Sequence, residues 1–564
     1  MDAMIRGFKN FWVVTVVQVV FFFQIEVLYA SEPPVIVDTV FERKPQIQQQ
    51  STELPDLQTR TESLSSGSSI VIKNIEIQGG TVFSLEQVSD WLQPIIGKEA
   101  KRELLIEVLN NITTAYSKSG FPLSYASIPS GQDLSSGKII IRLVEGYVAR
   151  SEVEVDSKRI EDRIERYVTR MMQERPLSKK TFERYVSLIE ATPGYKFHIN
   201  VPKPMSATGA TTIRVEQVEK ELIQPSLALD NSDSNRILAS VGVNSSTSYA
   251  DQLTIAGLFS NDVDKFYSAT YSQFINDDGL TVQLGARYYK SDETDRFSVV
   301  DIPMDYFESK TREEYSIGLS YPLELSQTHA WWVGSKIHHF DEASVFKLRS
   351  QSSFAQINKD LKYSAVEAYT SLLINTSKSV RQASVALKQG VDLGANQNEL
   401  GDSSVTVSGA ENLYFTYLTT ELFWRSRVAK KWQIQTRLHG QWTDDILPSA
   451  EQDRYGNILF ARGYPEGQAQ GDRGYAGEVE LRYIHPLNTT FIKQIEPYFI
   501  VDAARTHLLS NGNRSSLSSS SVGIAFTDNR YYGLSMEYSV PTGDLPIDSN
   551  RRSGVVNLRV QWQL

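Results

Sequence analysis

Residues 432–442 have the sequence Trp-Gln-Ile-Gln-Thr-Arg-Leu-His-Gly-Gln-Trp. The large apolar side chains fall on one parity and the Gln, Arg and His side chains on the other. This is the period-two pattern of a β-strand with one apolar and one polar face. Residues 280–289, 532–540 and 556–564 repeat it. The sequence therefore predicts antiparallel strands from about residue 221 to residue 564.

The second face and the ends of these strands favour a membrane barrel over a soluble β-sandwich. Many strands end in Tyr or Trp, which suits the aromatic girdles of a membrane barrel, and the polar face suits a water-filled lumen. Every backbone amide in hydrocarbon needs a partner, so such a sheet must close. At about 20 residues per strand and loop, about 340 residues predict a 16-stranded antiparallel transmembrane β-barrel.

A segment between two predicted strands is unusually rich in Arg, Gly and Tyr. Residues 461–464 read Ala-Arg-Gly-Tyr, and residues 471–475 read Gly-Asp-Arg-Gly-Tyr. Glycine permits tight turns, and the planar guanidinium of Arg fits a carboxylate. Period-two counting over residues 497–504 places Asp502 on the lumenal face, where a charge is tolerated. One interpretation is a loop at about 455–477 that enters the lumen and holds Arg462 against Asp502; an ordinary surface loop explains the same residues equally well.

Composition excludes several classes of function. The chain has 564 residues, no Cys and a formal net charge of -10. The lack of Cys excludes disulfides, thiolate catalysis and Cys-ligated metals. The negative net charge gives no indication of a basic surface for nucleic acid. The sequence contains no G-x-S-x-G or H-E-x-x-H motif. We predict no enzyme, cofactor or metal site, with paired lumenal acids such as Glu478, Glu480 and Glu537 as the weak catalytic alternative.

The N-terminus predicts export from the cytoplasm. Arg6 and Lys9 precede a short apolar run, which is typical of a secretory signal peptide over residues 1–30. Leu28 fits the -3 position of a cleavage site poorly, and a single membrane anchor is the alternative. Residues 31–69 are rich in Gln, Ser, Thr, Glu and Pro, which predicts a periplasmic linker that could hold a short plug helix.

Two compact mixed units are predicted before the barrel. In residues 70–147, a strand leads to a helix with a capping box at Ser84, to a helix at 100–118 that Gly120 ends, and to two strands. The same β-α-α-β-β order returns in residues 148–220, which indicates tandem domains. An extended peptide can add to the edge strand of such a sheet; the alternative is that both units are spacers.

The motifs of this chain resemble those of the two-partner secretion outer-membrane transporters, the haemolysin and adhesin secretion-activation family, within the superfamily that includes the barrel-assembly insertases. The first POTRA (polypeptide-transport-associated) domain of that family carries G-Y/F, P-x-Q-x-hydrophobic and V-E-G motifs. The matching residues are Gly120, Phe121, Pro129, Gln132, Leu134, Glu145 and Gly146. The residues that match the family's lumenal loop motif are Arg462, Gly463, Tyr464, Gly471, Asp472 and Gly474.

The resemblance also implies that the loop Arg pairs with an Asp of the barrel wall, here Asp502. The chain departs from the family at four positions. Ile500 and Ala504 stand where the family favours Phe and Gly, Ala461 replaces a frequent Val, and Leu564 replaces a frequent C-terminal Phe. These departures bear mostly on the partners of Asp502.

The resemblance implies a function: the secretion of one large exoprotein across the bacterial outer membrane by two-partner (type V) secretion. Two periplasmic POTRA domains would bind the unfolded substrate, and a cytolysin, an adhesin and a contact-dependent toxin are all open as cargo. Further implied partners are outer-membrane lipid and the barrel-assembly machinery that inserts the chain. The alternatives are a barrel-assembly insertase, which usually has more POTRA units, and a plain porin or nutrient receptor.

Overall fold

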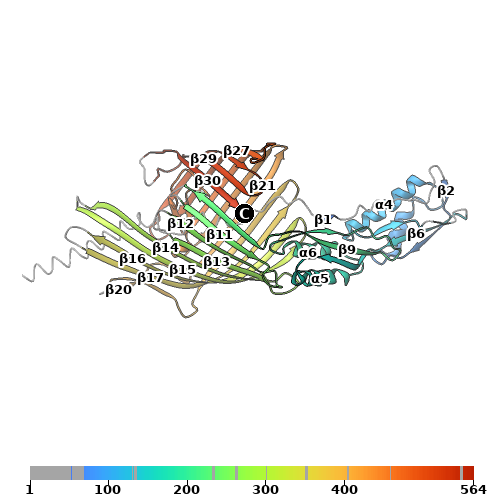
Figure 1. The fold of residues 1–564 in the computed structure, drawn as a ribbon, viewed down its shortest axis with the longest axis horizontal. Helices are drawn as coiled ribbons and strands as arrows, with labels where there is room; N and C mark the ends of the chain where they lie inside the picture. Colours follow the sequence, from blue (N-terminus) through green and yellow to red (C-terminus); the bar gives the residue numbers. More distant parts are fainter. Residues whose placement is uncertain are drawn as a thin grey trace, which may run out of the picture.

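The computed structural model describes residues 52–53, 69–129, 131–132, 136–231, 236–260, 265–299, 302–349, 354–402, 405–457, 459–546 and 551–563. The predicted signal peptide, most of the predicted linker and Leu134 lie outside the described residues. Figure 1 shows two small mixed units at one end of the molecule and a large β-barrel at the other. No helix among the described residues is long and apolar enough to cross a membrane.

The first unit is a three-stranded sheet covered by two helices. Its sheet has the order β3-β6-β5, and β2 pairs separately with β4. Helix α3 begins at a capping box, because Ser84 and Gln87 cap one another's backbone N–H groups. The apolar stripe of α4 is buried against the sheet. The elements are β2 (Ser69–Val71), β3 (Asn74–Gln78), α3 (Leu85–Leu92), β4 (Glu99–Lys101), α4 (Arg102–Lys118), β5 (Tyr125–Ser127) and β6 (Lys138–Val144).

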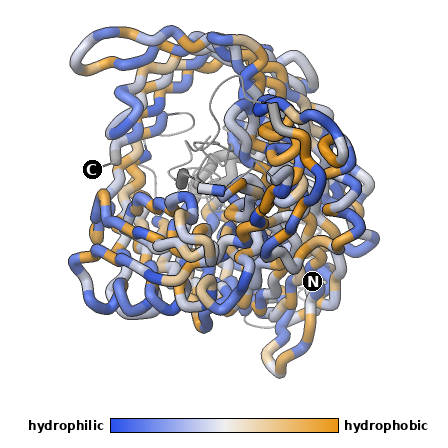
Figure 2. Tube along the Cα trace, turned by 90° about the vertical axis from the view of Figure 1, so that its right-hand side faces the viewer, coloured by the Kyte–Doolittle hydropathy of each residue, from blue (hydrophilic) through white to orange (hydrophobic). Residues whose placement is uncertain are grey.

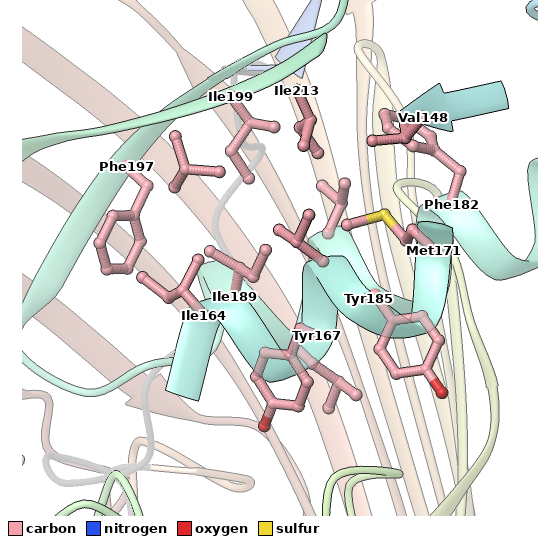
Figure 3. Close-up of a cluster of buried hydrophobic side chains, with 14 of the residues drawn as sticks. Val148, Ile164, Tyr167, Met171, Phe182, Tyr185, Ile189, Phe197, Ile199 and Ile213 are labelled. Atoms are coloured by element: carbon pink, nitrogen blue, oxygen red, sulfur yellow. The ribbon is translucent and has the colours of Figure 1, made fainter. Parts of the chain in front are cut away.

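The second unit repeats the β-α-α-β-β order. Its elements are β7 (Tyr147–Glu154), α5 (Lys158–Met172), α6 (Lys179–Glu190), β8 (Tyr195–Asn200) and β9 (Ala210–Lys220), and β1 (Thr52–Glu53) adds a short parallel strand to β8. Figure 3 shows how Tyr167 and Ile164 of α5 and Phe182 and Ile189 of α6 form one buried cluster with the sheet. The two amphipathic helices thus bury their apolar faces on one side of this sheet.

The second unit is fixed to the barrel. Its core continues into the turns of the barrel through Phe274 and Leu325. Arg184 of α6 donates hydrogen bonds to the carbonyl oxygens of Asp278 and Pro322, at 2.6 and 3.1 Å. The nearby Arg166 forms an ion pair with Asp277 at 3.0 Å. These apolar and polar contacts attach the unit to several turns at once.

The third part is a closed antiparallel barrel, which confirms the predicted fold class. Sixteen described strands follow one another around the wall, and β30 pairs with β10 to close it. They are β10 (Ile223–Asp230), β11 (Arg236–Asn244), β12 (Gln252–Ser260), β13 (Lys265–Phe274), β14 (Thr281–Val299), β15 (Ile302–Leu325), β16 (His329–Arg349), β17 (Phe354–Asn375), β18 (Ser379–Val391), β21 (Thr416–Ala429), β22 (Trp432–Thr443), β25 (Arg473–Tyr483), β27 (Gln494–His507), β28 (Arg514–Thr527), β29 (Tyr532–Pro541) and β30 (Val555–Gln563). The short strands β19 (Gln397–Gly401), β20 (Thr406–Ser408) and β26 (His485–Pro486) extend this sheet.

The barrel wall has its apolar side outside. On β25, Val479 is 45% exposed, whereas the adjacent Glu478 is 1% exposed and faces the lumen. On β29, Met536 and Tyr538 are likewise exposed while Glu537 between them is buried. In Figure 2 hydrophobic and hydrophilic residues alternate along the wall. A continuous exposed apolar belt on a closed sheet is the arrangement that a lipid bilayer requires.

Four consecutive strands are much longer than a bilayer needs. β14, β15, β16 and β17 contain 19, 24, 21 and 22 residues, whereas a tilted membrane-spanning strand needs about 9–11. Their ends that lie away from the second unit project beyond the rest of the wall (Figure 1). The wall is therefore higher on this side than on the side of β25–β30.

Candidate functional site

The loop that joins β22 to β25 lies inside the barrel. It contains a short helix η1 (Ser449–Glu451) and a hairpin of β23 (Asp453–Tyr455) with β24 (Ala469–Gly471). Tyr455, Phe460 and Tyr464 of the loop are buried together with Ala504 and Leu517, which belong to the wall strands β27 and β28. Of the two interpretations of this segment, the structure therefore has the loop that folds back into the lumen.

The predicted loop boundary of 455–477 is wrong at both ends. The loop runs from residue 444 to 472, because β22 ends at Thr443 and β25 begins at Arg473. Gly474 is a strand residue whose missing side chain leaves room for the loop. A Cβ atom there would lie 2.2 Å from the Asp453 carboxylate. Gly474 therefore marks a close contact between the loop and the wall, and it does not mark a turn.

Arg462 stands at the tip of the loop and binds two carboxylates of the wall. Its Nη2 and Nε atoms donate to Oε2 of Glu478, at 2.7 and 2.9 Å, and Nη1 donates to Glu537 at 3.2 Å. All three side chains are nearly buried, with exposures of 12%, 1% and 7%. A fork of donors shared between buried acids is a strong and directional anchor.

The expected pair of Arg462 with Asp502 is only partly correct. Asp502 does lie beside the loop tip, but it accepts the backbone N–H of Arg462 at 3.3 Å and the hydroxyl of Ser519 at 2.6 Å. The guanidinium instead reaches Glu478, which is the cross-strand neighbour of Asp502. Period-two counting places both acids on the lumenal face but does not say which one the side chain reaches.

Gly463 and Tyr464 fix the approach of the tip to the wall. A Cβ atom on Gly463 would lie 2.5 Å from the backbone nitrogen of Pro541, so the loop touches the end of β29 directly. The Tyr464 hydroxyl donates to the Asp544 carbonyl at 2.9 Å and accepts the Gly543 N–H at 3.0 Å. Gly463 thus allows the loop tip to approach the wall closely, and Tyr464 binds the tip to the residues that follow β29.

Asp472 and Gly471 close the base of the loop. The Asp472 side chain is fully buried. It accepts the backbone N–H groups of Leu447 and Leu509, at 2.8 and 2.7 Å, and so joins both limbs of the loop to the turn after β27. A Cβ atom on Gly471 would lie 2.8 Å from His507. These two motif residues therefore shape the loop, and they do not face the open lumen.

A second attachment of the loop involves residues that the sequence analysis missed. Glu451 accepts hydrogen bonds from Tyr363 and Tyr417, at 2.8 and 2.5 Å, and forms an ion pair with Lys388 at 2.7 Å. These three residues lie on β17, β21 and β18, in a part of the wall remote in sequence from the strands that bind Arg462. A further ion pair joins Glu466 to Arg236 of β11 at 2.5 Å. No sequence motif marks these partners, because they meet only after the barrel has closed.

The motif residues of the first unit hold its backbone. Gln132 donates to the carbonyl of Ile140 at 2.9 Å and accepts its N–H at 2.7 Å. Its side-chain amide thus takes the place of a strand backbone beside Ile140, beyond the point where β5 has ended. Gln132 also donates to the carbonyl of Pro129. Phe121 packs on the core, and Gly120 ends α4 with a φ of 87°.

Glu145 and Gly146 join the first unit to the second. Glu145 accepts the N–H and hydroxyl of Thr81, at 2.6 and 2.7 Å, and the N–H of Val82. Burial opposes ionisation of Glu145, but these hydrogen bonds outweigh it and lower the pKa of the carboxyl. The Gly146 carbonyl accepts the N–H of Leu177 at 3.0 Å, and a Cβ atom there would lie 2.3 Å from the backbone of Leu123.

Comparisons with known proteins agree with this architecture. Residues 70–146 match the ShlB-type POTRA domain, and residues 355–526 match the haemolysin secretion/activation protein ShlB/FhaC/HecB. No curated protein matches the chain. Among solved structures, CdiB from Escherichia coli is 16% identical with a TM-score of 0.67, over 90% of this chain and 93% of that one. CdiB from Acinetobacter baumannii is 16% identical with a TM-score of 0.59, over 94% and 96%.

A third solved structure shares the fold at a lower TM-score. BamA from Haemophilus ducreyi lacking POTRA domains 1–3 is 13% identical with a TM-score of 0.51, over 88% of this chain and 100% of that one. At these identities the structural likenesses establish the fold, and the two family matches carry the assignment. The first unit matches a POTRA domain, and the barrel segment 355–526 matches the haemolysin secretion/activation protein family.

Proposed function

We propose that this chain secretes one large exoprotein of the haemolysin, adhesin or contact-dependent toxin type, and that the loop between β22 and β25 closes its pore at rest. The observation that carries the proposal is the position of Arg462, bound between Glu478 and Glu537 inside a barrel whose apolar face is outside. The loop is held by side chains and not by the hydrogen-bond ladder of the wall. It can therefore leave the lumen while the barrel stays closed.

The attachments on different parts of the wall support a closing role. Arg462 binds strands β25 and β29, while Glu451 binds β17, β18 and β21. A loop held at both places crosses the lumen instead of lining one side of it. The resting loop obstructs passage, and an unfolded chain that enters must displace at least one of the attachments.

The periplasmic units are proposed to receive the exoprotein. Within the described part of the first unit, β3 and β5 are the outer strands of the sheet and have backbone groups to offer. An extended substrate can add to such an edge through main-chain hydrogen bonds, which select for an unfolded chain and not for a particular sequence. The second unit, fixed to the barrel turns, would then hold the captured chain near the pore mouth.

We place the barrel in the outer membrane and both units in the periplasm, and we expect the barrel-assembly machinery to insert the chain. Neither ATP nor a proton gradient is available in that membrane. Folding of the exoprotein outside the cell would make its transfer one-way.

The test compares surface and medium proteins with and without the gene. Loss of a single very large protein, with all other outer-membrane barrels unchanged, is the expected result. Depletion of many barrels would instead indicate a barrel-assembly insertase. Re-expression of the chain with Arg462→Ala, at equal protein level, then tests the loop, since equal secretion would remove its proposed role.

A further inference from the structure

A row of basic residues lies on the lipid side of the barrel at its outer end. Arg473 of β25, His507 of β27 and Arg514 of β28 are direct cross-strand neighbours. In the next row towards the membrane, Tyr475, Arg505 and Ser516 are also direct neighbours. Opposite residues of an antiparallel pair share a face. We define these six residues as the outer-rim patch.

The register shows that the outer-rim patch faces outward. Val479 and Val501 are cross-strand partners, and both are 45% exposed on the apolar belt. Tyr475 and Arg505 are a further pair on the same strands, each four residues from that pair and therefore on the same face. Arg505 and Arg514 are both exposed. The arginines thus stand over the lipid belt and not over the lumen.

The height of the patch corresponds to the boundary of the membrane. On β27, the outward positions from residue 495 to residue 503 are uncharged. Eight steps of about 3.4 Å on a strand tilted by about 40° climb about 21 Å, against a lipid-facing band about 25 Å tall. Arg505 follows two residues later. It therefore lies where the acyl chains end and the headgroups begin.

Two of the three arginines of the patch, Arg505 and Arg514, have no carboxylate partner among the described residues and can bind an anion. Arg505 donates to Ser516 Oγ at 3.2 Å and to Tyr475 Oη at 3.3 Å, and both partners are neutral. Neither Arg505 nor Arg514 forms an ion pair with any residue that the structure describes. Arg473 pairs with Asp444, whose side chain is 72% exposed, so that water and other anions reach this pair. Arg473 also lies over the Trp442 ring, 5.6 Å from its centroid.

We infer that the outer-rim patch binds the phosphate groups of a phosphorylated glycolipid of the outer leaflet, of the lipid A type. Arginine forks match phosphate oxygens in geometry and charge. Tyr475 and Trp442 are placed to contact the sugar and the start of the acyl chains, as aromatic residues do at this depth. A single strand cannot provide this arrangement, because the guanidinium groups come from three adjacent strands.

The test measures lipid binding to the purified full-length chain in detergent by native mass spectrometry. The probes are phosphorylated lipid A, the same lipid with its phosphates removed, and inorganic phosphate. We expect retention of the phosphorylated lipid alone. We also expect the double variant Arg505→Gln, Arg514→Gln to weaken that retention at least tenfold, and Arg505→Lys, Arg514→Lys to recover part of it.

The matched control is Lys265→Gln. Lys265 begins β13 at the same end of the barrel, is exposed, and stands opposite the outward-facing Phe259. This variant should bind lipid A as the unchanged chain does. Heat-modifiable migration on gels shows that each variant barrel is folded. Equal binding of dephosphorylated lipid, an unaffected double variant, or an equal loss in the control would each overturn the inference. Because the assay requires no secretion, its outcome is independent of the proposed function.

Discussion

Replacing Arg462 with Ala is the sharpest test of how the loop is held. In the seated loop the substitution removes the Arg462 cation from Glu478 and Glu537, with three charge-assisted hydrogen bonds in all. Both carboxylates then stay nearly buried beside a loop that no longer neutralises them. When the loop leaves, they face lumenal water in either protein, so the loss falls on the seated state alone.

The magnitude follows from the burial of the pair. Breaking a buried ion pair by removing one partner costs about 3–5 kcal/mol. Since about 1.4 kcal/mol is a tenfold change in an equilibrium constant, the balance between seated and released loop shifts by about 150- to 4,000-fold. A pore that is almost always closed would then be open for a measurable share of the time.

Single-channel conductance in planar bilayers measures this share directly. We expect frequent large openings for Arg462→Ala and an intermediate frequency for Arg462→Lys, which keeps the charge but loses the fork. The triple variant Arg462→Ala, Glu478→Gln, Glu537→Gln removes the stranded charges and should close more often than Arg462→Ala alone. Unchanged openings in a folded Arg462→Ala barrel would refute the reasoning, as would a triple variant that opens more often.

Three other substitutions separate the parts of the structure. Gly474→Ala places a Cβ 2.2 Å from the Asp453 carboxylate; we expect faster protease cleavage of the loop than in Gly533→Ala, where a Cβ meets open space. Gln132→Leu strands the N–H and C=O of Ile140, and should lower the unfolding free energy of the first unit by about 1–3 kcal/mol in urea titrations. The pKa of Glu145 is lower in the folded protein than in the unfolded chain. The stabilisation that Glu145 provides is therefore present above the unfolded pKa of about 4.3 and is lost as the pH falls through the folded pKa. Glu145→Gln should flatten the pH dependence of the unfolding free energy of this unit below about pH 4.3, and an unchanged pH dependence would contradict this.

The period-two pattern of the sequence predicts which face of the sheet a side chain lies on better than it predicts which residue that side chain contacts. Alternation alone places Glu478, Asp502 and Glu537 on the lumenal face, since side chains on a strand have only two directions. It does not choose among these acids. That choice depends on the direction from which the tip arrives, which is fixed by the contact of Gly463 with the backbone of β29.

Contacts that form only when the barrel closes are even harder to predict from the sequence. Glu451 meets Tyr363 across 88 residues of sequence and Lys388 across 63, and no local pattern links these positions. The short β5 is a related case. Its residues have the composition of a longer strand, but the side chain of Gln132 occupies the place where the strand would continue. Local sequence patterns predict helices and strands. They do not show where a side chain takes the place of a backbone hydrogen-bonding group.

The loop also has a mechanical consequence for the barrel. A wide cylinder made of one sheet bends easily towards an oval cross-section, because flattening it changes the angles between strands and leaves their hydrogen bonds intact. Glu451 connects the loop to β17, β18 and β21, and Arg462 connects it to β25 and β29. The loop therefore links two separate parts of the wall and resists this deformation. Release of the loop therefore softens the cylinder at the moment it opens, and the shape of the pore can adjust to the width of the chain that passes through it.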